Sequence, residues 1–309
     1  MMENLKTNSA PITSGHLFLF MEQVITDLNR LGRLRTAETY ATTLRSLKRF
    51  FHDKDVRLED LDSDKMMAYE AYLKSCGISP NTTSFYMRNL RAVYNRAVEK
   101  NLTPQRYPFR HVYTGVDKTV KRAVTAKVIR QIKQMDLRAH PSLDFARDMF
   151  LFSFYTRGMS FIDMAYLRKT DLSRGVLTYH RRKTGQQLTI KWERCMHQLV
   201  AKYDTGGSPY LLPIIRPQSR IDERTQYLYA SHKVNQCLKV IGARLKLPQP
   251  LTMYVSRHSW ASIARSLNVP ISVISEGMGH DSEATTRIYL ASLSTSVIDK
   301  ANLKILKLL

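Results

Sequence analysis

Residues 251–290 of the chain read LTMYVSRHSWASIARSLNVPISVISEGMGHDSEATTRIYL. This stretch predicts three helices, which run from about 257 to 268, from about 271 to 278, and from about 283 onward. Gly279 stops the second helix, and Asp281-Ser282 can cap the third. His280 therefore falls in the turn between two helices, which favours a functional role over a place in the apolar core.

The charge of the chain points to a polyanionic partner. Its 48 Lys and Arg against 26 Asp and Glu give a net charge of +22 and a pI near 10.0. Such a surplus repels itself unless a polyanion neutralises it, so nucleic acid is the first partner to consider. Ribosomal and membrane-surface proteins share this surplus of positive charge, so the charge alone does not decide between these classes of protein.

Other bulk properties predict a globular cytoplasmic protein. Hydrophobic residues make up 43% of the chain, enough to bury a core. Cys76, Cys195 and Cys237 are far apart and form no CxxC pair, which is typical of reduced thiols. The apolar runs 17–21 and 149–155 are far below the ~18 residues of a membrane span, and no secretory signal is visible. We expect a cytoplasmic, nucleoid-associated protein that does not engage a membrane.

The sequence pattern divides the chain into four parts. Residues 1–14 predict a flexible tail, 15–104 a helical bundle, 105–124 a linker, and 125–309 a second, mixed domain. Helical spacing with interleaved basic residues marks the bundle, and Ser79-Pro80 predicts a helix start there. The linker is either a solvated loop or a strap along DNA phosphates. The candidate DNA-binding residues of these parts are Arg88, Arg91, Lys121 and Arg122.

A β-hairpin is predicted inside the second domain. Residues 175–180 and 188–192 have the composition of strands, and they flank Lys183-Thr184-Gly185-Gln186, a plausible turn.

The ordered series Arg257, His280 and Tyr289, with Tyr289 nine residues after His280 in a basic chain, resembles the tyrosine recombinases of the phage-integrase family. The resemblance implies a mainly α fold, with an N-terminal helical core-binding (SAM-like) bundle and an α+β catalytic domain containing a small antiparallel sheet. Both would form a clamp around DNA.

The resemblance also implies roles. Tyr289 would be the nucleophile that forms a 3′-phosphotyrosyl bond, and Arg257 would hold two phosphate oxygens. His280 would donate a further hydrogen bond to the phosphoryl oxygens, and Lys183 would protonate the leaving 5′ oxygen. No metal or nucleotide cofactor is implied.

Two positions depart from the family pattern. Ser160 stands where the first active-site arginine belongs, and with Asp163 it resembles a capping box. We expect Arg157, three residues earlier on the same helical face, to supply the missing guanidinium, with Arg181 as the second choice. Tyr254 replaces a histidine that helps to take the proton of the nucleophile. A tyrosine is a poor base at neutral pH, so water or His280 would take that proton.

Partners follow from the same resemblance. They are double-stranded DNA with inverted-repeat core sites, further copies of the chain up to a tetramer in the synapse, and accessory DNA-bending proteins. An apolar stripe at Ile298, Ala301, Ile305 and Leu308, preceded by a capping pair at Ser296 and Asp299, predicts a last helix. That helix would dock on a neighbouring copy or on its own domain.

Two rival interpretations stay open. Residues 268–290 have the pattern of a helix-turn-helix, so a repressor or architectural DNA-binding protein, or a catalytically weak relative, is one alternative. Type IB topoisomerases use similar chemistry and are the other.

Overall fold

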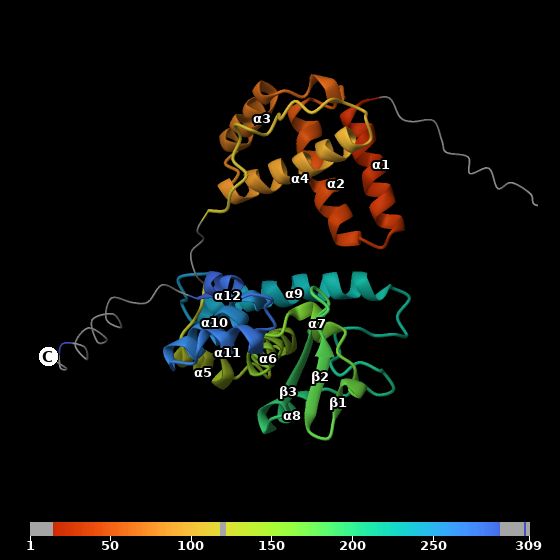
Figure 1. Cartoon of the computed structure of the whole chain (residues 1–309). Coiled ribbons are helices and arrows are strands. Elements are labelled where there is room, and N and C mark those ends of the chain that lie inside the picture. Colours follow the sequence, from red (N-terminus) through yellow and green to blue (C-terminus); the bar gives the residue numbers. More distant parts are fainter. Residues whose placement is uncertain (1–14, 118–121, 291–305, 307–309) are drawn as a thin grey trace, which may run out of the picture. The chain divides into compact units, whose positions relative to one another are not determined.

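The computed structural model describes residues 15–117, 122–290 and 306 (Figure 1). The chain divides into two compact units, residues 1–119 and 120–309, each with its own hydrophobic core. No helix within the described ranges is long and apolar enough to cross a membrane.

The first unit is helical throughout. Its elements are α1 (Leu17–Arg30), α2 (Leu34–Phe50), the 3₁₀ turn η1 (Leu58–Asp60), α3 (Ser63–Ser75) and α4 (Pro80–Glu99). Helix α4 begins at Pro80, as predicted, but its cap is Ser79, which accepts a hydrogen bond from the backbone N–H of Thr82, and not the Asn and Thr neighbours that we expected. Met21, Leu47 and Val93 are fully buried where α1, α2 and α4 contribute to the core. The bundle predicted from helical spacing is therefore present.

Part of the segment predicted as a linker packs on this first unit. Phe109 and Val112 are buried in its core. The backbone N–H of Tyr113 donates to the Glu70 carboxylate at 2.8 Å, and the Ser84 hydroxyl donates to the carbonyl of Gly115 at 2.6 Å. The two apolar side chains stand among polar and basic neighbours, so no periodic pattern marks them in the sequence.

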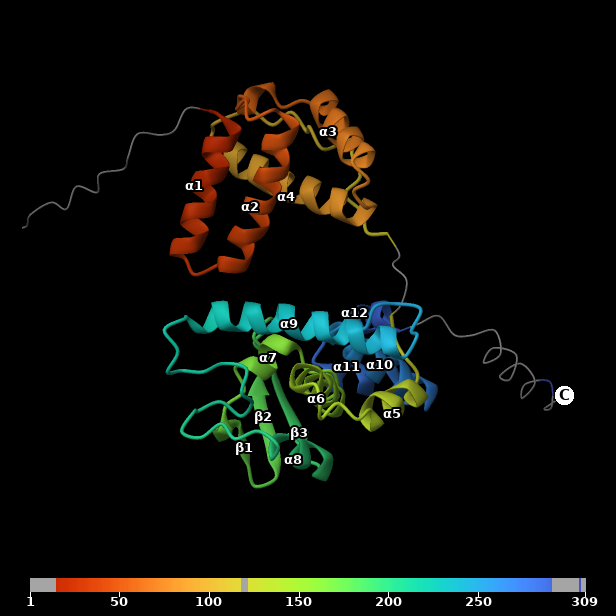
Figure 2. The ribbon, with the colours of Figure 1, turned by 180° about the vertical axis from the view of Figure 1, so that it is seen from behind.

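The second unit combines helices with a small sheet (Figure 2). Its elements are α5 (Ala126–Gln134), α6 (Pro141–Tyr155), α7 (Phe161–Ala165), η2 (Lys169–Asp171), β1 (Leu172–Ser173), β2 (Val176–His180), β3 (Gln187–Lys191), α8 (Arg194–Val200), α9 (Glu223–Arg244), α10 (Met253–Ser266), α11 (Ile271–Met278) and α12 (Glu283–Tyr289). Helix α6 contacts α5, α7, α8, α9 and α10, and its Phe150 and Phe152 are fully buried. It is the central element of this unit.

The sheet is antiparallel with strand order β1-β2-β3. Leu177 pairs with Ile190 and Tyr179 with Leu188, and all four side chains point into the core. The hairpin, predicted from two segments of strand composition on either side of a turn, is confirmed. The two-residue strand β1 is too short to leave a periodic signal. The mainly helical architecture with one small antiparallel sheet confirms the predicted fold class.

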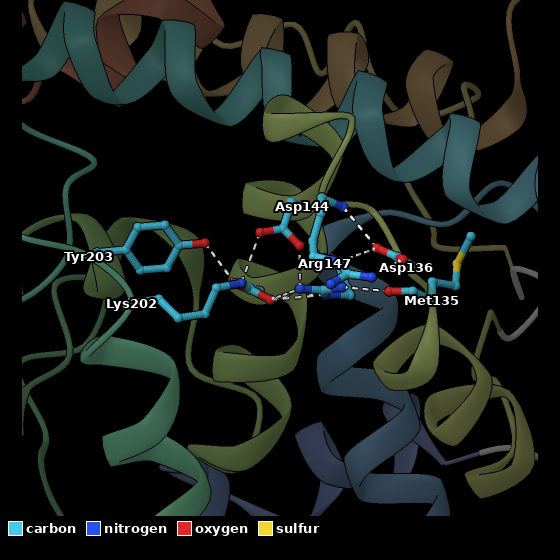
Figure 3. Close-up of polar contacts among 8 residues, drawn as sticks. Met135, Asp136, Asp144, Arg147, Lys202 and Tyr203 are labelled. Carbon is cyan, nitrogen blue, oxygen red and sulfur yellow. Dashed lines mark hydrogen bonds and ion pairs between the residues drawn. The ribbon is translucent and has the colours of Figure 1, made fainter.

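A buried polar network fastens α6 to its neighbours (Figure 3). The Arg147 guanidinium donates to the Asp148 carboxylate at 2.8 Å and to the backbone carbonyl of Met135 at 2.7 Å. The Tyr203 hydroxyl donates to the same carboxylate at 2.7 Å, and Lys202 also bonds it. Because the carboxylate is buried, these donors compensate for its lost hydration. The network joins the ends of α5 and α8 to α6, the helix that α10 contacts.

Candidate active site

Helix α10 positions the first site residues. It begins at Met253, four residues before the predicted start, so Tyr254, Arg257 and His258 all lie in its first two turns. The side chain of Thr252 does not cap the helix, so the usual mark of a helix start, a capping side chain, is absent here. Instead, the backbone N–H of Met253 donates to the side-chain oxygen of Asn235 at 2.9 Å. A tertiary contact therefore supplies the start that the local sequence does not mark.

Arg257 is buried, with 6% of its surface exposed. Its guanidinium donates to the carbonyls of Gly158 at 2.8 Å and Met278 at 2.7 Å, and to Nε2 of His280 at 2.8 Å. Gly158 has φ +78°, and a Cβ there would lie 2.8 Å from the Arg257 Cα. The close approach of a left-handed glycine thus allows the guanidinium to be held in one orientation.

His280 follows the left-handed Gly279, which ends α11 as predicted. Its backbone N–H donates to the carbonyl of Ser275 at 3.0 Å. Burial lowers the pKa of His280 to about 4, and the positive charges of Arg257, Arg181 and Lys183 act in the same direction. The imidazole is therefore neutral at physiological pH.

Helix α12 begins beside this imidazole and ends at Tyr289. Ser282 caps it by accepting from the backbone N–H of Thr285, which confirms the predicted cap. Thr286 is fully buried, and its hydroxyl lies 2.8 Å from Nδ1 of His280. The sequence reasoning did not single out Thr286. The feature of the sequence that could have pointed to Thr286 as a site residue is its position one helical turn before Tyr289.

Arg181 joins the same cluster from the hairpin. It is buried, and its guanidinium donates to the carbonyl of Gly279. A Cβ at Gly279 would lie 2.8 Å from the Arg181 Cδ, so this turn also requires a glycine. The backbone places two arginines, Arg181 and Arg257, on the two sides of the turn that carries His280.

Lys183 lies in the exposed turn between β2 and β3. The backbone N–H of Arg181 donates to the carbonyl of Gln186 at 2.8 Å, and that of Gly185 donates back to Arg181 at 2.7 Å. The buried carboxylate of Asp163 accepts from the backbone N–H of Arg182 at 2.9 Å and anchors the turn. The charge of Lys183 acts on the pKa of His280, so this turn faces the cluster.

Arg157 is not on a helix. Helix α6 ends at Tyr155, and Arg157 has φ +61°, so the helical turn that we expected to carry it toward the position of Ser160 is absent. Its side chain lines a hollow of about 630 Å³ together with Gln186, Trp260 and other residues of β3, α10 and α11. Ser160 caps α7 as predicted, and its hydroxyl donates to the Asp163 carboxylate at 2.6 Å.

Tyr254 is 54% exposed on the first turn of α10. Its ring meets the His258 ring edge-on, with the ring centroids 4.5 Å apart. Arg88 and Arg91 are exposed on α4, and Arg122 is exposed just before α5. Lys121 and the predicted C-terminal helix with its stripe and cap, residues 296–308, lie outside the described residues, apart from residue 306.

Comparisons with known proteins bear on the fold that carries this site. Residues 16–112 match the family model of the phage integrase SAM-like domain. A comparison with curated proteins finds no significant match.

Solved structures match over most of the chain. A lambda integrase dimer bound to a COC′ core site has a TM-score of 0.68 at 15% identity, covering 89% of this chain and 95% of that chain. A lambda integrase tetramer bound to a Holliday junction has a TM-score of 0.67 at 15% identity, with coverage of 90% and 78%. The Tn1549 transposon integrase in complex with a circular intermediate DNA has a TM-score of 0.65 at 15% identity, with coverage of 95% and 100%. The chain has the fold of these integrases and carries a phage integrase SAM-like domain, which confirms the predicted resemblance to tyrosine recombinases.

Proposed function

We propose that this protein is a site-specific DNA recombinase that cuts and rejoins DNA through a 3′-phosphotyrosyl intermediate on Tyr289. The observation that carries the proposal is the gathering of Arg257, Arg181 and His280 around one turn, directly before the helix that ends at Tyr289. Buried guanidinium groups suit a phosphodiester, because they match its charge and offer paired N–H donors.

The family's first active-site arginine is replaced by Ser160 in this chain, and the geometry indicates which other arginine could take its role. Arg181 is buried beside the His280 turn, and its charge contributes to the lowered pKa of His280. Arg157 instead lines the hollow beside α11. We therefore assign to Arg181 the role that Ser160 cannot fill, and Arg157 becomes the alternative.

The reaction divides into two balanced steps. In the first, the Tyr289 hydroxyl gives its proton to water or His280 and its oxygen bonds to phosphorus, while the bond to the 5′ oxygen breaks and Lys183 supplies a proton to that 5′ oxygen. Arg257 and Arg181 stabilise the charge that develops on the phosphoryl oxygens, a contribution of ~3 kcal/mol for each such donor. In the second, a 5′ hydroxyl attacks the phosphotyrosine and returns its proton to Lys183, while the bond from phosphorus to the Tyr289 oxygen breaks and that oxygen regains its proton. The phosphodiester energy is kept in the intermediate, so no ATP is required.

Tyr254 is exposed on the same helix as Arg257, and its proposed role is to donate a hydrogen bond to a phosphate. The DNA partner is proposed to be a duplex with inverted-repeat core sites. The similar lambda integrase structures hold a dimer on a core site and a tetramer on a Holliday junction, so a tetrameric synapse is the corresponding assembly here. The net charge of +22 suits this polyanionic partner, and accessory DNA-bending proteins are further candidates.

Trapping of the covalent intermediate tests the proposal. A nicked suicide duplex that carries the inverted repeats flanking the gene lets the cleaved fragment diffuse away. We expect wild type to give a protein–DNA adduct that resists denaturation, and Tyr289→Phe to bind the same duplex without forming one. Binding without an adduct in wild type would favour the second candidate, a non-catalytic DNA-binding protein, for which Ser160 and Tyr254 are the supporting observations. Binding alone does not separate the two, because both predict a steep dependence on salt.

A further inference from the structure

A continuous chain of polar contacts links α10 to α12 through His280. The Arg257 guanidinium lies 2.8 Å from Nε2 of the imidazole, and the Thr286 hydroxyl lies 2.8 Å from Nδ1. Arg257 and Thr286 are both buried, so water does not compete strongly for either ring nitrogen. Each ring nitrogen therefore has a buried protein partner.

The donors and acceptors in this chain fix the tautomer of the ring. A guanidinium has only N–H donors, so Nε2 of His280 must accept. A neutral imidazole carries one proton, which must then be on Nδ1, and Nδ1–H donates to the Thr286 hydroxyl oxygen. An imidazolium would direct an N–H at the guanidinium, so the contact requires the neutral ring. The lowered pKa of His280 agrees with a neutral ring.

We propose that Thr286 is a positioning residue whose hydroxyl holds His280 as the Nδ1–H tautomer, with Nε2 as a proton acceptor. This inference rests on the proposed recombinase function and deepens it. In this tautomer His280 does not begin the reaction as a donor to the phosphate, as the family resemblance implied. It begins as a base.

With His280 as the base, the proton of the Tyr289 hydroxyl has a defined acceptor in the first step. As the Tyr289 oxygen bonds to phosphorus, its O–H bond breaks and the proton moves to Nε2, while Arg257 turns its N–H from Nε2 to the phosphate. The resulting imidazolium donates that same proton as a hydrogen bond to a phosphoryl oxygen. In the rejoining step the proton returns to the tyrosine oxygen as the bond to phosphorus breaks. His280 thus takes the part of the histidine that Tyr254 replaces.

The position of Thr286 ties this function to the nucleophile. Thr286 and Tyr289 are on one helix, three residues apart, so any displacement of α12 moves both together. Arg257 on α10 holds Nε2, and the second contact, from Thr286 to Nδ1, is made only when the helix of the nucleophile is docked.

The imidazole tautomer can be measured directly in the full chain without DNA. The ¹⁵N shifts of histidine-labelled protein distinguish a protonated from an unprotonated ring nitrogen, and the spectrum of His280→Gln assigns the signal. We expect the Nδ1–H form in wild type and in Thr286→Ser, which keeps the hydroxyl. Thr286→Val has the same shape without the hydroxyl and leaves Nδ1–H without an acceptor, so we expect the ring to turn away from Arg257 and to give the Nε2–H form in part of the molecules.

Adduct formation on the suicide duplex is the second readout. We expect Thr286→Val to slow it about tenfold or more and Thr286→Ser to remain close to wild type. Thr286→Ala serves as a second variant without the hydroxyl if Thr286→Val does not fold, and thermal melting identifies that case.

An Nε2–H ring in wild type would overturn the inference. So would an unchanged tautomer together with an unchanged adduct rate in both variants that lack the hydroxyl. If wild type forms no adduct but its Nδ1–H signal is lost without the hydroxyl, the recombinase proposal fails, and the positioning of His280 by Thr286 stands.

Discussion

Two glycine turns in the second unit perform the same task by different contacts. Gly158 and Gly279 both have positive φ, and the carbonyl of each accepts a hydrogen bond from a buried arginine of another segment. At Gly158 a Cβ would meet the backbone Cα of Arg257 at 2.8 Å, whereas at Gly279 it would meet the side-chain Cδ of Arg181 at 2.8 Å. A backbone atom on a packed helix cannot withdraw, but the end of a long side chain can. The Arg257 side of the site is therefore fixed, and the Arg181 side is adjustable.

The largest expected effect comes from Gly158→Ala. The added methyl group must push the start of α10 away from the turn, and φ +78° is itself strained for alanine. We expect the free energy of unfolding to fall by about 3 kcal/mol or more, measured by urea denaturation.

Two matched variants separate the causes of that loss. Gly175 has φ +73° with nothing within 4 Å of its Cβ position, so Gly175→Ala measures the backbone strain alone, about 1 kcal/mol. Gly279→Ala should fall between the two, because the Arg181 side chain can move. Equal losses at Gly158 and Gly279 would remove the distinction between a fixed and an adjustable side.

The next effect concerns the two candidate arginines. Arg181→Lys keeps the positive charge but loses the planar pair of N–H donors, and we expect adduct formation on the suicide duplex to slow about 100-fold. Arg157→Lys is the matched control, because Arg157 lies in the hollow beside α11, and its adduct rate should stay close to wild type. The reverse order of rates would restore Arg157 to the role assigned to it from the sequence.

The sequence favoured Arg157 and the structure favours our proposal of Arg181, and this difference shows which features of the site can be predicted from local sequence. The helix start at Pro80, the N-cap Ser282 and the stop at Gly279 were predictable, because each depends on backbone groups within a few residues. The hairpin was predictable from alternation along two adjacent strands.

Arg181, our proposed second guanidinium, could not be identified from the sequence in the same way. The expectation for Arg157 assumed that α6 continues, but a left-handed conformation at a non-glycine residue follows from packing that no local pattern encodes. Arg181 reaches Gly279 across 98 residues of sequence, and such a contact depends on the complete fold. Thr286 was missed for a related reason: a threonine near a helix start is common, and only its burial against His280 distinguishes it.

The last expected effect is a pH dependence that comes from the burial of the His280 imidazole beside the positive charge of Arg257. The pKa of His280 is about 4 in the folded chain against an ordinary value of 6.5. Between these values the unfolded chain binds the extra proton and the folded chain does not, so the contribution of His280 to stability is complete above about pH 6.5 and decreases as the pH falls toward 4. Other titrating groups act in the same range, so the comparison is between wild type and His280→Gln in urea denaturation from pH 7 to pH 4. Wild type should lose more stability over this interval than the variant. Parallel curves for the two proteins would mean that the pKa of His280 is not lowered in the folded chain, and would contradict a neutral ring that accepts from Arg257.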